Sequence, residues 1–280
     1  MIQASDIELR AGARLLMSGA DLRVGPGDRI GLVGRNGAGK TTLMKVLAGL
    51  DQPAAGSVTR GEVGYLSQDP AAADGQQSAL ARIMSARGLD AAVARMQRHA
   101  ARMQDPRKRD EAMRRYASAE AEFLAQGGYS AEAEALAVAD GLGLSAEHLA
   151  RALGTLSGGQ RRRVELARIL FGGGGVLLLD EPTNHLDADS IAWLRGFLSN
   201  YPDGVVVISH DVGLLREVVN RVAHLDANRC RLEVYNLGWD AYQRQVEVDA
   251  RRRRREQANA GKQAEALRSQ AERMRAKATK

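Results

Sequence analysis

The chain has 280 residues, 44% of them hydrophobic, which suits one large domain or two small ones with a substantial core. No apolar run approaches the roughly 20 residues that span a bilayer, and the first residues lack the pattern of a secretory signal. We therefore expect a cytoplasmic protein with no transmembrane segment of its own. The single cysteine, Cys230, excludes an internal disulfide and a cysteine metal cluster.

Basic residues are concentrated at the end of the chain. Residues 251–280 hold 11 basic and 3 acidic residues, a net charge of +8, whereas the whole chain carries +6. Five consecutive arginines, Arg251 to Arg255, open this segment. A basic segment on a near-neutral domain favours a polyanionic partner, although a solvated helix face has the same composition.

The first 50 residues predict strands, a phosphate loop and a helix. Alternating apolar residues around Ile7 are followed by a turn at residues 25–28 and an apolar strand from Arg29. The sequence GRNGAGKT, residues 34–41, comes next and matches G-x-x-x-x-G-K-[ST]. A helix is expected after it, with four residues on one face: Leu43, Val46, Leu47 and Leu50.

A strand, a glycine loop and a helix in this order favour a nucleotide site over a structural glycine turn. Backbone N–H groups of the loop and the helix N-terminus would surround the phosphates, Lys40 would reach the β- and γ-phosphates, and Thr41 would hold Mg²⁺. We assign nucleotide binding to Gly34, Arg35, Asn36, Gly37, Ala38, Gly39, Lys40, Thr41 and Thr42.

A helical segment is expected over about 69–156. Residues 88–103 and 107–129 predict two helices, the second starting at Pro106 and ending at Gly127 and Gly128. Their alanine, methionine and leucine stripes favour the core of a helical hairpin. After this segment, Ser157 to Gln160 stand at the start of another helix, which is a second anion-binding end. Because the chain already has one phosphate-binding helix, we expect this end to serve another subunit or domain.

Two adjacent acids end the apolar run VLLLDE at residues 176–181. In a phosphate-loop enzyme, Mg²⁺ needs an acid at the tip of a neighbouring strand, and Asp180 is placed to supply it through water. Glu181 would then polarise the water that attacks the γ-phosphate. The alternative is that both acids only cap a strand or a helix. His210 follows the apolar strand VVVIS and is expected to contact the γ-phosphate.

These motifs together resemble the ATP-binding-cassette (ABC) ATPases, because LSGGQ stands between the phosphate loop and LLLDEPTNHLD. Asn184 and His185 in the last motif, with GRNGAGKTTL and LSGGQRRRVELARIL, resemble the ABC-F branch, whose members act on ribosomes. The resemblance implies ATP and Mg²⁺ as cofactors. It implies catalytic roles for Glu181, His210 and Gln68, metal contacts for Thr41, Gln68 and Asp180, contact with the opposing nucleotide for Ser157, Gly158, Gly159 and Gln160, and a nucleotide-site role for Asp187.

The resemblance also implies the fold and the domain boundaries. We expect an α/β P-loop NTPase of the ABC nucleotide-binding type over residues 1–236, with an antiparallel β layer and the helical subdomain. Residues 237–280 would be a basic helical linker. ABC-F proteins resemble two cassettes in tandem, and this sequence has one phosphate loop and one signature, so we expect the N-terminal half of such a protein.

The functional expectation is ATP-gated binding to the ribosome and its RNA, as a translation factor or as protection against antibiotics. A second cassette would complete the active site, so the chain alone would hydrolyse ATP slowly. Residues 9–16 contain no aromatic side chain, which leaves the choice between ATP and GTP open. The alternatives are the energy-coupling subunit of a membrane exporter and a DNA-handling ATPase.

Overall fold

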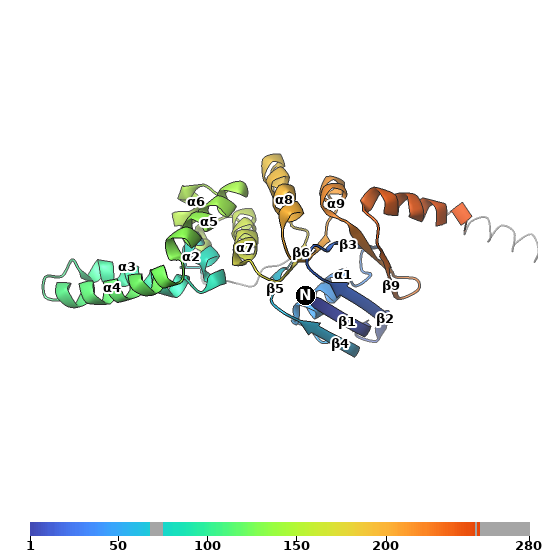
Figure 1. Ribbon diagram of the computed structural model, residues 1–280, viewed down its shortest axis with the longest axis horizontal. Helices are drawn as coiled ribbons and strands as arrows, with labels where there is room; N and C mark the ends of the chain where they lie inside the picture. Colours follow the sequence, from blue (N-terminus) through green and yellow to red (C-terminus); the bar gives the residue numbers. More distant parts are fainter. Residues whose placement is uncertain (68–74, 250, 253–280) are drawn as a thin grey trace, which may run out of the picture.

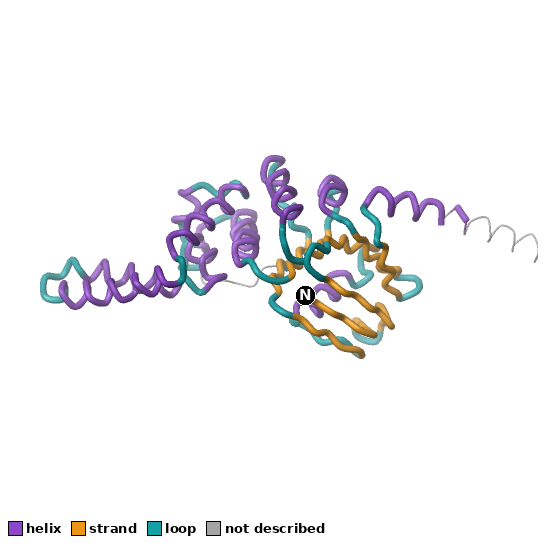
Figure 2. The backbone as a smooth tube through the Cα atoms, in the orientation of Figure 1, coloured by secondary structure: helices purple, strands orange, loops and turns teal. Residues whose placement is uncertain are grey.

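The computed structural model describes residues 1–67, 75–249 and 251–252. Gln68 and nearly all of the basic segment 251–280 lie outside the described residues. Figure 1 shows a strand-rich lobe at one side, a helical lobe at the other, and helices α7, α8 and α9 between them above the sheet. The tube in Figure 2 separates the same two parts by secondary structure.

A mixed sheet of six strands forms the centre of the strand-rich lobe. Its order is β5-β6-β7-β3-β8-β9, and all neighbours are parallel except β8 and β9. The strands are β3 (Arg29–Gly34), β5 (Val63–Leu66), β6 (Val176–Asp180), β7 (Val205–Ile208), β8 (Arg221–Asp226) and β9 (Arg231–Tyr235). Strands β6 and β7 are buried at every residue, because helices or a second sheet cover both faces, and this explains their continuous apolar sequences.

A second sheet of three antiparallel strands forms the predicted β layer. Its order is β2-β1-β4, with β1 (Ile2–Ala11), β2 (Arg14–Val24) and β4 (Ala55–Arg60). Ile2 and Ala4 are buried, and after a shift in register so are Ile7 and Leu9, as expected for a sheet with one face on a core. This core also contains α1 (Lys40–Ala48) and one face of the parallel sheet.

The opposite face of the parallel sheet packs on a separate core. Here α7 (Gly158–Gly172), α8 (Ala188–Asn200) and α9 (Val212–Val218) cover the strands. Successive residues of β6 point to different cores: Leu177 and Leu179 to the helices, Leu178 to the antiparallel sheet. The two acids at the end of β6, Asp180 and Glu181, are therefore held by a strand that is packed on both faces.

The helical lobe is built from more helices than the sequence indicated. It contains α2 (Ala79–Met84), η1 (Ser85–Arg87), α3 (Asp90–Arg102), α4 (Arg109–Ala125), α5 (Gly128–Gly141), α6 (Ala146–Ala150) and η2 (Leu153–Thr155). The two predicted helices correspond to α3 and α4, which pack as a hairpin projecting from the lobe (Figure 1).

Two boundary predictions are wrong. Helix α4 begins at Arg109 and not at Pro106, because Pro106 lies in a turn in which the Asp105 carboxylate accepts a hydrogen bond from the Arg107 N–H at 3.0 Å. Leu50 does not share the buried face of α1, since Gly49 ends that helix in a left-handed conformation and leaves Leu50 69% exposed.

A further helix follows β9 over residues 239–249, with residues 251–252 also helical. Trp239 at its start packs against the helical core, and Tyr242 is buried there. No helix within the described residues is long and apolar enough to cross a membrane. The α/β fold with an antiparallel layer is confirmed.

Candidate nucleotide-binding site

The phosphate loop connects β3 to α1 at the carboxyl end of the parallel strands. Gly39 precedes α1 with φ of 105°, and a Cβ there would lie 3.0 Å from Leu16 Cδ1, so glycine is required by conformation and by space. The Lys40 ammonium turns back along the loop and donates to the carbonyl oxygens of Gly34 at 2.8 Å and Arg35 at 3.2 Å. The N–H groups in the first turn of α1 and the Lys40 ammonium therefore lie beside the same phosphate loop.

Burial lowers the pKa of Lys40, and the negative charges of Asp180 and Glu181 oppose that shift. A phosphate beside the ammonium would add negative charge and favour the protonated lysine further. The geometry therefore suits an anionic ligand.

Asp180 lies at the end of β6 and is 2% exposed. Its Oδ2 accepts a hydrogen bond of 2.8 Å from the hydroxyl of Thr41, in the first turn of α1 directly after the phosphate loop. A hydroxyl and a carboxylate side by side are oxygen ligands of the kind that Mg²⁺ takes, together with phosphate oxygens. Within the described residues no group of three or more His, Cys, Asp or Glu side chains could hold a metal ion. When bound, Mg²⁺ would neutralise phosphate charge there.

Glu181 follows directly, in a conformation unusual for a residue with a side chain. Its φ is 51°, and its N–H donates to the Ile208 carbonyl at 2.8 Å. The carboxylate meets His210 twice: Oε2 accepts from the His210 N–H at 3.3 Å, and Oε1 lies 3.3 Å from His210 Nε2. The imidazole itself is 78% exposed. Non-glycine residues with positive φ cluster at functional sites, where the surroundings impose the conformation.

Burial raises the pKa of Glu181 and Asp180 adds to this, whereas His210 and Lys40 act in the opposite direction. A carboxylate with a raised pKa is a stronger base than an ordinary glutamate. Glu181 therefore combines a fixed position with the basicity that proton abstraction needs.

This pKa shift predicts how Glu181→Gln changes stability with pH. The folded protein holds the Glu181 proton more tightly than the unfolded chain, so the ionised carboxylate costs stability at pH above the raised pKa. We expect Glu181→Gln to raise Tm at pH 8, and this gain to shrink as pH falls and to vanish below about 4.5, the ordinary glutamate value. Thermal unfolding of nucleotide-free protein from pH 4 to 8 measures it. A constant gain across this range would contradict the assignment, and exposed Glu111→Gln is the control.

A buried arginine that the sequence analysis missed holds this segment from behind. Arg162 on α7 is 8% exposed, and its Nη2 donates to the carbonyl oxygens of Asp180 at 2.9 Å and Glu181 at 3.1 Å. Its Nη1 donates to the Ser67 carbonyl at 3.2 Å, beside the end of β5. Arg162 thus ties the helix after the signature to the peptide units that carry both acids. In the sequence it is one of three consecutive arginines and carries no distinguishing signal.

A pocket of about 490 Å³ is lined by half of the predicted site residues. It is lined by Ala11, Arg14, Leu16, Asn36, Gly37, Gly39, Lys40, Thr41, Thr42, Asp180, Glu181, Asn184, Ile208 and His210. The predicted residues Gly34, Arg35 and Ala38 do not line it. Ala38 points into the core at 1% exposure, because its N–H closes the loop onto the Arg35 carbonyl.

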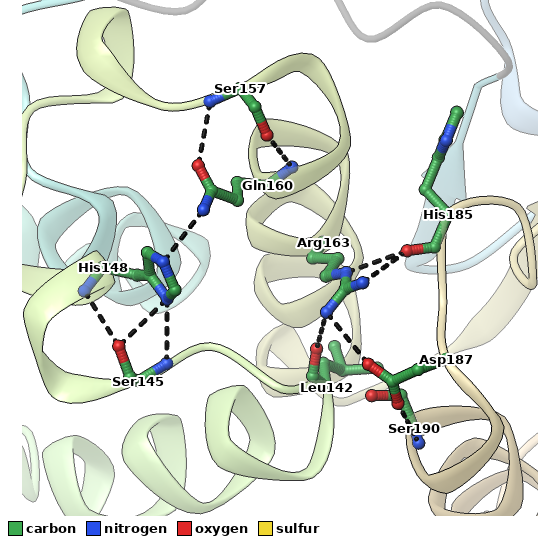
Figure 3. Close-up of polar contacts among 9 residues, drawn as sticks. All are labelled: Leu142, Ser145, His148, Ser157, Gln160, Arg163, His185, Asp187 and Ser190. Carbon is green, nitrogen blue, oxygen red and sulfur yellow. Dashed lines mark hydrogen bonds and ion pairs between the residues drawn. The ribbon is translucent and has the colours of Figure 1, made fainter.

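The signature residues and Asp187 also lie outside this pocket. Ser157 caps α7, and its hydroxyl accepts from the Gln160 N–H at 3.2 Å (Figure 3). Asp187 caps α8 by accepting from the Ser190 N–H at 2.9 Å, and this backbone hydrogen bond lowers its pKa. Arg163 links the two helices, donating to the His185 carbonyl at 2.7 and 2.9 Å. One chain therefore presents the signature away from its own phosphate loop.

Arg14 is the other residue that sequence analysis passed over. It opens β2 at the tip of the β1–β2 hairpin and lines the pocket beside Ala11 and Leu16. Its guanidinium forms no hydrogen bond or ion pair with any described residue. Arg14 is not aromatic, so a pattern that requires an aromatic residue in this hairpin does not indicate it. The only indication in the sequence is its position at the hairpin turn before the phosphate loop.

The family follows from a comparison with known proteins. A family model described as ABC transporter matches residues 17–184, more than half of the chain. The chain belongs to the ABC transporter family of ATP-binding cassettes. The cassette is accordingly an ATP-binding ATPase domain, and the expectations of an ABC cassette and of ATP as ligand are confirmed at that level.

Curated relatives of the cassette are longer proteins. It is 38% identical over 239 residues to the uncharacterized ABC transporter ATP-binding protein YkpA of Bacillus subtilis, covering 84% of this chain and 44% of that protein. It is 37% identical over 219 residues to the tylosin resistance ATP-binding protein TlrC of Streptomyces fradiae, covering 76% and 40%. The chain thus spans less than half the length of these relatives.

Solved structures share the fold at lower identity. One described as the ATP binding subunit of an ABC transporter superposes with a TM-score of 0.65 at 17% identity, covering 88% of this chain and 93% of that one. A second, described as the dimeric bacterial ABC transporter cassette MJ0796, gives a TM-score of 0.59 at 19% identity, covering 85% and 100%. The P-loop ABC cassette fold is therefore confirmed.

Proposed function

We propose that the cassette is the N-terminal half of an ABC-F type ATPase that acts in the cytoplasm and uses ATP to gate binding to the ribosome. In this proposal residues 1–236 form the ATPase domain, about 69–156 its helical subdomain, and 237–280 a basic linker to a second cassette. The observation that carries it is the pocket in which Lys40, Thr41, Asp180, Glu181 and His210 meet.

The proposed hydrolysis assigns one task to each group. Lys40 binds the β- and γ-phosphates, and Glu181 accepts the proton of the attacking water through a carboxylate that His210 orients at 3.3 Å. Thr41, Asp180 and Gln68 would hold Mg²⁺, which supplies positive charge against the phosphates when bound. Glu181 is only 7% exposed, so the surrounding protein shields its carboxylate from bulk water.

A second cassette would complete the site. The start of α7 offers N–H groups to an anion, yet Ser157 to Gln160 do not line the pocket of their own chain. A facing cassette would place its signature over the γ-phosphate bound by this chain. Asp187 would then lie near the interface between the two cassettes. The dimeric form of the related MJ0796 cassette supports such pairing. Hydrolysis by the chain alone is therefore expected to be slow.

The ribosome is the proposed partner because positive charge stands at two separate places. Besides the +8 of residues 251–280, the α3–α4 hairpin carries eight basic and six acidic residues over 90–125. Four of its arginines, Arg98, Arg102, Arg107 and Arg114, form neither an ion pair nor a side-chain hydrogen bond with any described residue. Unpaired basic side chains suit the phosphates of RNA. The likeness to TlrC, described as a tylosin resistance protein, supports a role in protection against antibiotics.

Sedimentation with ribosomes tests this proposal. Glu181→Gln protein is expected to pellet with purified ribosomes in Mg-ATP, less as salt is raised from 50 to 300 mM, and not without nucleotide, because phosphate contacts weaken with salt. Absence of pelleting, with and without the matching C-terminal cassette, would contradict it. Copurification with a membrane protein instead would favour the energy-coupling subunit of an exporter, an alternative that the family description as ABC transporter supports.

Arg14 is the expected contact of the nucleotide base. Its planar guanidinium can stack on a purine, and it lines the pocket where no aromatic residue of β1 or β2 does. We expect Arg14→Ala to weaken binding of fluorescent ATP by about three- to tenfold and Arg14→Tyr to restore it. The control is Arg23→Ala, an exposed arginine on the same strand. Equal loss in Arg14→Tyr and Arg14→Ala would exclude stacking.

A further inference from the structure

Two helix starts of the same design, those of α6 and α7, lie next to each other. At α7, the Ser157 N–H donates to Gln160 Oε1 at 2.9 Å and the Gln160 N–H donates to Ser157 Oγ at 3.2 Å. At α6, His148 takes the place of the glutamine, with Ser145 N 3.2 Å from its Nδ1. Figure 3 shows the two capping boxes joined by one contact, Gln160 Nε2 to His148 Nε2 at 2.9 Å.

The hydrogen-bond inventory fixes which atom of this contact donates. Gln160 Oε1 already accepts from Ser157, so the amide group facing His148 is NH₂, which only donates. Rotating the amide would set NH₂ against the Ser157 N–H. A hydrogen bond at this contact therefore requires His148 Nε2 to accept, and a neutral ring that does so carries its proton on Nδ1, where Ser145 Oγ lies 3.0 Å away.

This assignment creates a choice for the histidine. With the proton on Nδ1, the ring cannot also accept from the Ser145 N–H. With the proton on Nε2, it caps α6 but sets a donor against the Gln160 amide. His148 can thus complete its own helix start or support Gln160, whereas a glutamate at this position, with two accepting oxygens, would not be restricted in this way.

We propose that His148 is a positioning residue of the signature: in its Nδ1–H form it holds the Gln160 side chain, and through it the Ser157 N–H and the first turn of α7. Arg163, one turn further, is anchored on other partners, the carbonyls of His185 and Leu142. His148 lines no nucleotide pocket of its own chain, so it acts through Gln160. The consequence for the opposing nucleotide rests on the proposed two-cassette site.

Two substitutions separate the two duties of the ring. In His148→Gln, the amide oxygen reaches the place of Nε2 and can accept from Gln160. In His148→Asn, the shorter amide reaches only the place of Nδ1 and can cap α6. We expect amide exchange of residues 157–160 to rise about fivefold in His148→Asn, as for the loss of one hydrogen bond, and to stay within about twofold of the parent in His148→Gln.

Hydrogen exchange by mass spectrometry on the nucleotide-free chain measures this, with Tm confirming that both variants fold. Faster exchange in His148→Asn alone supports the proposal. Equal exchange in the two variants, raised or not, overturns it, because only His148→Gln keeps an acceptor within reach of Gln160. Faster exchange in His148→Gln alone overturns it as well.

A functional readout uses the same pair in the Glu181→Gln background. We expect His148→Asn to weaken the ATP-dependent dimer by about fivefold in analytical ultracentrifugation, with unchanged nucleotide binding by the monomer, and His148→Gln to match the parent. A dimer equally stable in both variants would contradict the role of His148 in the signature. If the parent forms no ATP-dependent dimer, alone or with a C-terminal cassette, the composite site fails, while the exchange comparison still decides how His148 acts on Gln160.

Discussion

Glu181→Gln is expected to lower ATP hydrolysis by about 100-fold or more while ATP still binds, because it removes the group proposed to accept the proton of the attacking water. Glutamine preserves the size of the side chain and can still accept a hydrogen bond from the His210 N–H, now 3.3 Å from Glu181 Oε2. It cannot take up a proton at neutral pH. Binding should hold, since the proposed phosphate contacts of Lys40 and the loop N–H groups do not involve Glu181.

Phosphate release at saturating ATP and equilibrium binding of a fluorescent ATP analogue measure the two effects separately. They require a preparation in which two cassettes can meet, either concentrated chain or the chain with its C-terminal counterpart. Glu111→Gln, an exposed glutamate on the α3–α4 hairpin, should leave both quantities unchanged. Residual hydrolysis above about a tenth of the parental rate would assign the base to another group.

Replacing Arg162 is expected to destabilise the protein more than any nearby surface change. In Arg162→Ala the carbonyl oxygens of Ser67, Asp180 and Glu181 lose a charged donor in a buried place. Loss of hydrogen bonds from a charged group costs about 3 kcal/mol, which lowers Tm by roughly 6–12 °C for a domain of this size. Hydrolysis should fall as well. Glu181 has a φ of 51°, and Arg162 helps to hold this conformation by donating a hydrogen bond to the Glu181 carbonyl oxygen.

The matched control is Arg161→Ala. Arg161 precedes Arg162 on the same helix but is exposed, so its loss should shift Tm by no more than about 2 °C. Thermal unfolding of the three proteins at one pH gives the comparison. Equal Tm values for the two variants would show that the carbonyl oxygens find other donors and that Arg162 does not secure the segment with the two acids.

The elements that the sequence predicts best are those encoded by short motifs or short apolar runs. The phosphate loop was predictable because its glycines, Lys40 and Thr41 are neighbours in the chain, and the backbone between β3 and α1 fixes their geometry. The start of α7 was predictable for the same reason, since a capping box spans four residues. Continuous apolar runs identified β6 and β7 because both faces of these strands are buried.

Weaker local signals gave poorer predictions. Helices α2 and α6 have six and five residues, too few to show a reliable helical period, and α5 is rich in alanine and glycine. The sequence predicts a helix start at Pro106, whereas a turn capped by Asp105 places Pro106 in the connection between α3 and α4. In each case the packing of neighbouring helices, or a side chain outside the motif, determines where the helix begins.

By itself the sequence determined the kind of site, a phosphate loop with two acids and a histidine on strands that end at one edge of a sheet. Only the tertiary structure decided how these groups meet: Thr41 on Asp180, His210 on Glu181, Arg162 behind both acids and His148 on Gln160. These contacts join segments separated by 12 to 139 residues. The physical reason is that a motif constrains the backbone of adjacent residues, whereas burial and hydrogen-bond satisfaction act between elements that only the folded chain brings together.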